Sequence, residues 1–185
     1  MNTINKSKIY YMTTYALMAA LMCIFGPMSV PIGPIPVSLT NLILYFAIFL
    51  IGTKGTTISY VVYLLLGIAG LPVFSGYQGG IAKVAGPTGG YLLGFIPMVV
   101  ICGICYAKAQ GKLNIPVTVV GMILGTAVAY LFGTIWFVMQ MDCEVSYALS
   151  VCVFPFIPFD LAKIVIANIL GRAVRKPLIK QGLIQ

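Results

Sequence analysis

The sequence contains no histidine, and only three of its 185 residues are acidic: Asp142, Glu144 and Asp160. Histidine is the commonest general base and a frequent metal ligand, so little material remains for hydrolytic or metal chemistry. Charged residues make up only 8% of the chain, whereas soluble domains carry roughly a quarter. The composition therefore argues against a soluble globular protein. It also argues against a disordered chain, which needs low hydrophobicity and high charge. We expect no catalytic residue, no metal site and no cofactor.

Hydrophobic residues, in contrast, make up 61% of the chain, and the mean hydropathy is +1.06. They form long unbroken runs without the alternation of a transmembrane β-barrel. Glycine, proline and polar breaks divide these runs into six blocks: residues 9–25, 37–51, 56–71, 91–107, 115–139 and 156–174. The pattern predicts an all-α membrane protein with six transmembrane helices in a single domain, 1–185. The first block is expected to be a retained helix rather than a signal peptide, because it is long and no small-residue cleavage site follows it.

The formal net charge of +8 reports topology rather than nucleic-acid binding, because no basic patch interleaves with aromatic residues. With six spans, nine of the eleven basic residues share one side: Lys6, Lys8, Lys54, Lys108, Lys112, Arg172, Arg175, Lys176 and Lys180. The other side holds Lys83 with two of the acidic residues. The positive-inside rule then predicts that both termini are cytoplasmic in a multi-pass protein of the plasma membrane.

The sharpest local signal is the segment PFIPFDLAK in the last block. Asp160 and Lys163 are three residues apart, so they share one face of a helix. Ionisable residues inside a membrane span are costly and usually functional, which makes this pair a candidate ligand site. The alternative is an ion pair that only fixes helix packing. Thr40 and Asn41, at the start of the second block, are the next polar candidates.

The second signal is a glycine-rich loop, with seven glycines between Gly70 and Gly90. Glycine lets the backbone approach a ligand closely, and loop amides can hold an anionic group. The loop also offers flat apolar walls and directional hydrogen bonds, a mixture that suits a small organic molecule. Its candidate binding residues are Phe74, Gln78, Gly80, Thr88 and Tyr91, with Trp136 as a further wall. The alternative is a flexible connector.

Three further features concern partners and thiols. Ala16 and Ala20 form a small-xxx-small pair on the first helix, which allows another helix to approach closely, either within the bundle or from a partner subunit. No P-loop is present, so the chain cannot hydrolyse ATP by that route. Cys143 and Cys152 flank a loop and could pair, but their spacing does not decide it.

The combination of GLPVFSGYQGG, GPTGGYLLGF and PFIPFDLAK in a basic six-span chain resembles the BioY family. These are the biotin-specific S components of energy-coupling factor (ECF) transporters. The resemblance implies capture of biotin from outside, a transmembrane coupling subunit and a pair of cytoplasmic ATPases. It also implies that Asp160, Lys163 and Gln78 hold the vitamin. Two residues depart from the family pattern, since Tyr77 and Phe159 each replace a glycine, and we expect both to add bulk beside the pocket.

Three other functions stay open at this point. The chain could be an S component for a different vitamin. It could be a small membrane enzyme, although we find no nucleophile–base pair or metal cluster for one. It could also be a homo-oligomeric channel, which would need a polar stripe along several helices. The polar residues cluster near one end of the bundle instead, as a capture site requires.

Overall fold

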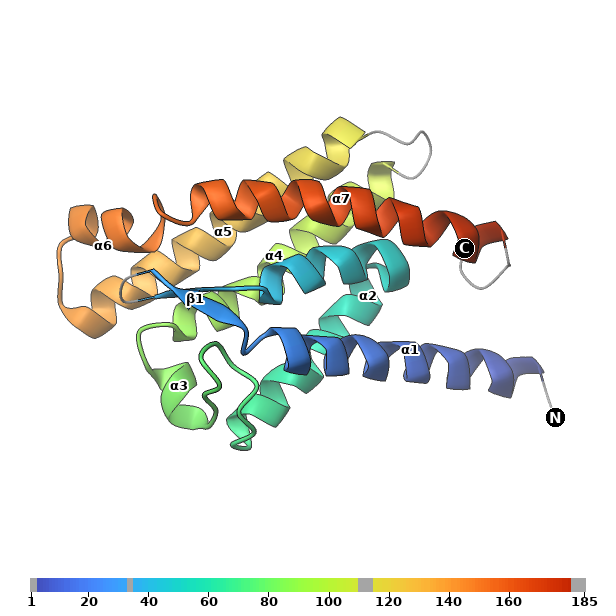
Figure 1. The fold of residues 1–185 in the computed structure, drawn as a ribbon, viewed down its shortest axis with the longest axis horizontal. Coiled ribbons are helices and arrows are strands. Elements are labelled where there is room, and N and C mark those ends of the chain that lie inside the picture. Colours follow the sequence, from blue (N-terminus) through green and yellow to red (C-terminus); the bar gives the residue numbers. More distant parts are fainter. Residues whose placement is uncertain (1–2, 33–34, 110–114, 181–185) are drawn as a thin grey trace.

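The computed structural model describes residues 3–32, 35–109 and 115–180, with side chains described from residue 9 onward. Over these residues the chain is predominantly helical. Its elements are α1 (Thr3–Phe25), β1 (Ser29–Pro31), β2 (Pro36–Ser38), α2 (Thr40–Ile68), α3 (Ile81–Ala85), α4 (Gly89–Ala109), α5 (Ile115–Met141), α6 (Val145–Cys152) and α7 (Ile157–Lys180). The long helices run roughly along one axis, and the start of α1 and the end of α7 lie at the same end of the molecule (Figure 1).

The described helices agree with the expected apolar blocks in place and differ from them in length. Three of these helices are long and apolar enough to cross a membrane, or four if the bent pair α6 and α7 forms one span. The apolar part of α1, Ile9–Phe25, falls just below that length. Helices α4, α5 and α7 each extend beyond the predicted block, because helical hydrogen bonding continues into the flanking polar residues.

The predicted break at residues 52–55 is wrong in extent, since only Gly52 leaves the helical conformation. Its φ of 67° and ψ of −177° lie where side-chain-bearing residues are strained. The chain bends there, and the second part of α2 turns back toward the end from which the first part began (Figure 1). One glycine therefore divides α2 into the two segments that the hydropathy pattern separates.

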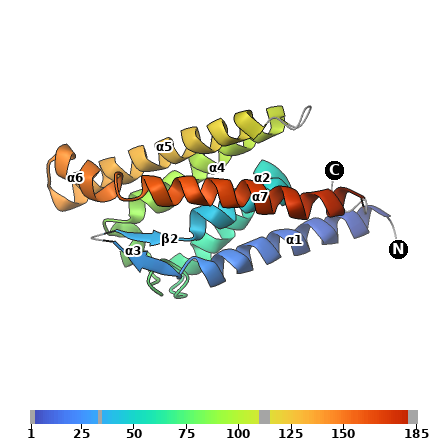
Figure 2. The same ribbon diagram turned by 45° about the horizontal axis from the view of Figure 1, so that its top comes forward.

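The proline-rich segment that follows α1 is more ordered than expected of a loop. Ser29–Pro31 and Pro36–Ser38 pair as a small antiparallel hairpin, with Val30 opposite Val37. This hairpin is a short β element in a fold expected to be all-α, and it delays the start of α2 from residue 37 to Thr40. It lies at the end opposite the termini, beside α3 and α6 (Figure 2).

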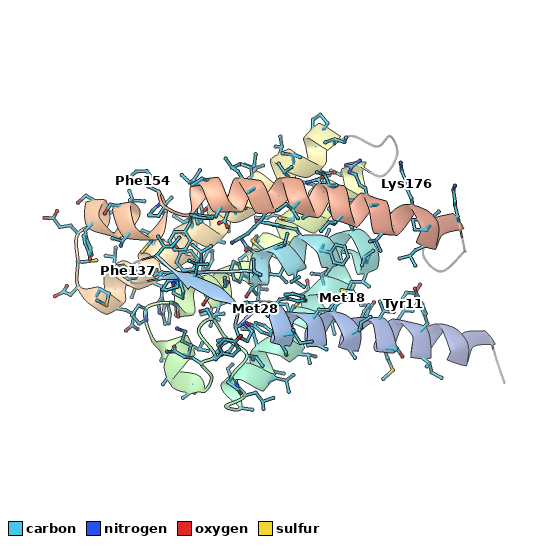
Figure 3. All side chains as sticks on the ribbon, viewed as in Figure 1. Tyr11, Met18, Met28, Phe137, Phe154 and Lys176 are labelled. Atoms are coloured by element: carbon cyan, nitrogen blue, oxygen red, sulfur yellow. The ribbon has the colours of Figure 1, made fainter. Side chains whose placement is uncertain are left out.

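Two hydrophobic clusters hold the bundle together. The larger one surrounds the first half of α2, where Leu44, Tyr45 and Ile48 are fully buried. The smaller one joins the hairpin to α5 and α6 around Phe137, which Figure 3 labels beside the hairpin. Both Cys143 and Cys152 belong to this region, and both are free thiols. The smaller cluster fixes the hairpin over one end of the helices.

Candidate functional site

Asp160 and Lys163 form a buried ion pair at the start of α7. The Lys163 Nζ lies 2.8 Å from the Asp160 Oδ1, and the two residues are only 6% and 7% exposed. Asp160 stands in the first turn of α7, where the positive end of the helix dipole favours a carboxylate. The predicted shared face of these two residues is confirmed.

The Lys163 ammonium uses all of its donors within the protein. It donates to the Ser38 carbonyl at 2.8 Å, to the Asn41 Oδ1 at 3.0 Å and to the Asp160 Oδ1. An ammonium has three N–H groups, so this charge is fully satisfied. Ser38 ends β2 and Asn41 lies in the first turn of α2. The hairpin and α2 therefore each supply one acceptor to the Lys163 ammonium of α7.

The Asp160 carboxylate keeps acceptor capacity that the protein does not use. Its Oδ1 accepts from Lys163 and from the Asn41 Nδ2, which lies 2.8 Å away. Its Oδ2 accepts from the Tyr130 hydroxyl at 2.7 Å. A carboxylate offers about four acceptor positions, and three are occupied by described residues. One position on the Oδ2 is left for a donor from a bound molecule.

This polar network lines a cavity between the hairpin and α2, α4, α5 and α7. Six of the nine predicted binding residues line it: Thr40, Asn41, Thr88, Tyr91, Asp160 and Lys163. The rest of its wall is mostly apolar or aromatic, including Ile35, Tyr63, Leu92, Phe95, Met98 and Phe156. Apolar walls with a few polar groups placed among them are typical of small-molecule sites.

Thr88 and Tyr91 belong to the second predicted group, the glycine-rich loop and its exit into α4. The Thr88 Oγ1 is buried and has no hydrogen-bond partner among the described residues. Buried hydroxyls are rarely left unpaired, so this atom is a natural contact for a ligand. The Tyr91 hydroxyl instead donates to the Cys152 carbonyl, and its ring stacks on Phe156 with the centroids 6.4 Å apart. Tyr91 is therefore a rigid wall of the cavity.

The structure places the other three predicted binding residues away from the cavity. Phe74 is fully buried against Tyr63, with the ring centroids 5.6 Å apart. Its backbone pairs with that of Gln78, whose own side chain is exposed. The Gly80 amide donates to the Gly67 carbonyl at 2.7 Å, so it is not free to hold an anion. These loop groups satisfy one another because the loop folds on itself.

Gln78 instead lines a second, shallower hollow on the outer surface of the loop. Lys83 on α3 and Thr88 line the same hollow. Thr88 also lines the main cavity, so the two spaces meet at this residue. Partial burial lowers the pKa of the Lys83 ammonium, because desolvation disfavours its charged form. The outer hollow is therefore next to the cavity, and Lys83 is the cationic side chain in its wall.

The two residues that replace family glycines do not crowd the cavity, contrary to expectation. Tyr77 is 66% exposed and Phe159 is 45% exposed, and neither lines the cavity. Tyr77 keeps a backbone conformation that favours glycine, with a φ of 58°. Its side chain points outward from that turn, so the added bulk meets solvent or lipid instead of a ligand.

Sequence reasoning missed Tyr130, Ser38 and Phe156. Tyr130 is one of eleven tyrosines and stands in an unbroken apolar block, where no local pattern separates it from core aromatics. Ser38 contributes its backbone carbonyl, which carries no sequence signature. Phe156 lies between two prolines, and that break was the one signal that its position is irregular.

Ala16 and Ala20 both lie on the exposed face of α1. The opposite face of the helix, with Met18, Ala19 and Met22, is buried against the bundle. The Ser59 hydroxyl of α2 also donates to the Tyr15 carbonyl at 2.9 Å, which fixes the rotation of α1. The alanine pair is therefore not used for packing within the described part of this chain.

Comparison with known proteins shows which family this chain resembles in sequence and in structure. The model of the BioY family matches residues 1–180. The chain is 33% identical over 172 residues to the biotin transporter BioY2 of Lactococcus lactis subsp. cremoris, covering 93% of each chain. It is 32% identical over 161 residues to the biotin transporter BioY of Thermotoga maritima, covering 86% of this chain and 92% of that relative. Its structure matches the crystal structure of the S-component for biotin from an ECF-type ABC transporter with a TM-score of 0.85, 31% identity and 95% of each chain covered.

Proposed function

Since the chain belongs to the BioY family, we propose that it is the membrane subunit that captures biotin from outside the cell for ATP-driven uptake by an ECF transporter. The observation that carries this function is the buried Asp160–Lys163–Asn41 network beside a cavity with apolar and aromatic walls. The ATP is used by partners: a transmembrane coupling subunit and two cytoplasmic ATPase subunits. The chain itself contributes selective binding within the lipid bilayer.

The unused acceptor position of Asp160 supports a specific role in recognition. Biotin carries a ureido ring with two N–H donors, and one of them can donate to the Oδ2 of Asp160. Lys163 has no donor left, so its main role is to hold the Asp160 carboxylate in place. Hydrogen bonds to an ionised acceptor shielded from water are the strong kind. We infer that the ureido ring lies at Asp160.

The opposite end of the ligand then lies toward the loop. The unpaired Thr88 hydroxyl offers a hydrogen bond to the valerate carboxylate, and Lys83 in the adjoining hollow favours that negative charge. Between the two ends, the walls formed by Tyr91, Phe95 and Phe156 suit the apolar thioether ring and chain. Such a pocket prefers a molecule with an apolar body and two different polar ends.

We propose six membrane crossings with both termini in the cytoplasm. The crossings are α1, the two segments of α2 on either side of Gly52, α4, α5 and α7. The segments of α2 have 12 and 16 residues by their bounds, shorter than the roughly 20 residues of a full span. They are nevertheless supported as crossings because the chain reverses between them (Figure 1). Of the basic residues that motivate the orientation, Lys112 lies outside the described residues, and so do the side chains of Lys6 and Lys8.

A cysteine at Ser75 tests this orientation. Ser75 lies in the glycine-rich loop and lines the cavity. In intact cells, Ser75→Cys is expected to react with a membrane-impermeant maleimide, and biotin should slow the reaction. The matched control is Lys54→Cys, which should react only after permeabilisation. Both variants are made in a background with Cys143→Ser, because that native thiol is partly exposed near the same end. Labelling of Ser75→Cys only in permeabilised cells would reverse the topology.

Replacing Tyr130 of α5 tests the role of the hydrogen bond that its hydroxyl donates to the Asp160 Oδ2. Tyr130→Phe removes only the hydroxyl and leaves the ring in place. This bond orients Asp160 and does not itself contact biotin, so we expect only part of its roughly 1.5–3 kcal/mol to appear in binding, as a fall in biotin affinity of about 3- to 10-fold by calorimetry. Tyr147→Phe, at an exposed position of α6, should bind as the unmodified protein does. Equal affinity for both variants would remove Tyr130 from the site.

Titration of the detergent-solubilised protein with radiolabelled biotin tests the proposed function directly. The expected result is saturable binding with about one biotin per chain and a sub-micromolar Kd, a strength that a shielded charged site supports. Absence of biotin binding, together with tight binding of another vitamin, would make this chain an S component of different specificity.

A further inference from the structure

The seam between α5 and α7 contains a surface hollow that shares no lining residue with the binding cavity. Both views show the two helices side by side (Figures 1 and 2). The hollow lies toward the C-terminal end of α7, where Ile115, Val119, Val165 and Ile169 line it. We call it the α5–α7 groove, and its walls are mostly apolar. A second hollow farther along the seam includes Asp160 of the binding cavity in its wall, so it is not part of this groove.

One end of the α5–α7 groove is charged. Arg172 and Lys176 line it, and because they are four residues apart they share one face of α7. Figure 3 shows Lys176 on α7 at the end of the molecule where the chain begins and ends. The Arg172 guanidinium lies over the Phe49 ring, 6.0 Å from its centroid. Its Nε is buried and donates to no described residue, which is unusual for a buried N–H.

The length of the groove matches half a bilayer. On α7 the lining of the groove runs from Val165 to Lys176, which are eleven positions apart, and at about 1.5 Å per residue this distance is roughly 16 Å. The hydrocarbon core of a bilayer is about 30 Å thick, so one leaflet is about 15 Å. A groove of this length, apolar at one end and cationic at the other, has the dimensions of part of an acyl chain joined to one phosphate.

We propose that the α5–α7 groove binds one phospholipid with an anionic headgroup. An acyl chain lies between Val165, Ile169 and the facing residues of α5. The headgroup phosphate accepts hydrogen bonds from Arg172, including its unpaired Nε, and from Lys176. Basic pockets between transmembrane helices on the cytoplasmic side are suited to anionic headgroups. Assignment to the cytoplasmic leaflet rests on the proposed orientation, whereas the selectivity for anionic lipid does not.

The experiment is native mass spectrometry of the full chain released from detergent micelles that contain phosphatidylglycerol or phosphatidylcholine with identical acyl chains. The unmodified protein is expected to retain one phosphatidylglycerol and to lose phosphatidylcholine. Arg172→Gln with Lys176→Gln should weaken phosphatidylglycerol retention roughly 30-fold, because each basic residue near an anionic headgroup contributes about a factor of five. Biotin binding should stay unchanged, since neither residue lines the cavity.

Lys54→Gln with Lys108→Gln is the matched control, because it removes the same charge from exposed positions outside the groove. It should retain phosphatidylglycerol. If the double variant at Arg172 fails to fold, Lys176→Gln alone, at an exposed position, should still lower retention about fivefold. Equal loss in the control, or equal retention of the two lipids by the unmodified protein, would overturn the proposal.

Filling the groove separates a lipid from a protein occupant. Val165 is 57% exposed, so Val165→Trp should fold, and we expect it to reduce phosphatidylglycerol retention. If this variant keeps its lipid but changes from dimer to monomer, the groove is an interface between copies of this chain. If it keeps its lipid but no longer co-purifies with the coupling subunit, the groove is a docking face. Either result would refute the lipid site.

Discussion

Replacement of Asp160 by Asn is expected to weaken biotin binding by roughly 30- to 1000-fold, the largest effect of any single substitution in the cavity. The change keeps the shape of the side chain but removes its charge, and it turns one acceptor into a donor. Losing a charge-assisted hydrogen bond in a dry site costs on the order of 2–4 kcal/mol. Calorimetry on the purified variant measures the loss.

Lys163→Ala should weaken binding to a similar degree through a different physical cause. It removes the cation that faces Asp160 at 2.8 Å, and Asn41 and Tyr130 then hold the carboxylate alone. The carboxylate then lacks its counter-charge and is held less firmly in the position that a ligand needs. Calorimetry on Lys163→Ala, compared with Asp160→Asn, measures the loss.

Loss of stability must be separated from loss of binding in these variants. Removing one partner of a buried ion pair destabilises a fold by about 3–5 kcal/mol, whereas replacing both by neutral groups is often tolerated. Asp160→Asn combined with Lys163→Met should therefore unfold at a higher temperature than the single Lys163→Ala variant, yet still fail to bind biotin. Lys108→Ala, which changes an exposed charge on α4, should bind normally. A double variant that binds with unchanged affinity would reduce the pair to a packing element.

Bulky residues at Ala16 and Ala20 are expected to abolish biotin uptake by cells without affecting biotin binding by the isolated chain. Both alanines lie on the exposed face of α1, one turn apart, where their small side chains leave a shallow groove for another helix. Because the chain has no P-loop, uphill transport needs a partner that supplies the energy. We propose that this face of α1 docks the coupling subunit. Ala16→Leu with Ala20→Leu would fill the groove.

Uptake and co-purification with the coupling subunit should fall together in this double variant, to background if the contact is obligatory. The matched control is Ala107→Leu, an exposed alanine on α4, which should leave both unchanged. Survival of both uptake and co-purification in the double variant would place the docking face elsewhere. Loss of biotin binding would mean that the alanines support the packing of this chain.

The binding site shows why the prediction succeeded for the charged pair on the last helix and failed for several residues of the glycine-rich loop. Asp160 and Lys163 were paired correctly because helical geometry alone brings residues three apart onto one face. The five candidates in and beside the glycine-rich loop were treated as equal, although only two of these five, Thr88 and Tyr91, line the cavity. The loop amides pair with one another and with α2. Which groups such a loop leaves free depends on its complete fold.

The sequence by itself determined the properties that depend on composition and on short spacing. Low charge and long apolar runs required helices in a membrane, glycine at position 52 divided the second run, and local periodicity paired Asp160 with Lys163 and Ala16 with Ala20. Only the tertiary structure brought Ser38 and Asn41 to Lys163 across 125 and 122 residues of sequence, and Tyr130 to Asp160 across 30. These contacts depend on how the hairpin and helices pack, and no spacing along the chain encodes that packing directly. Helix periodicity is a property of neighbouring residues, whereas a binding cavity forms where distant segments meet.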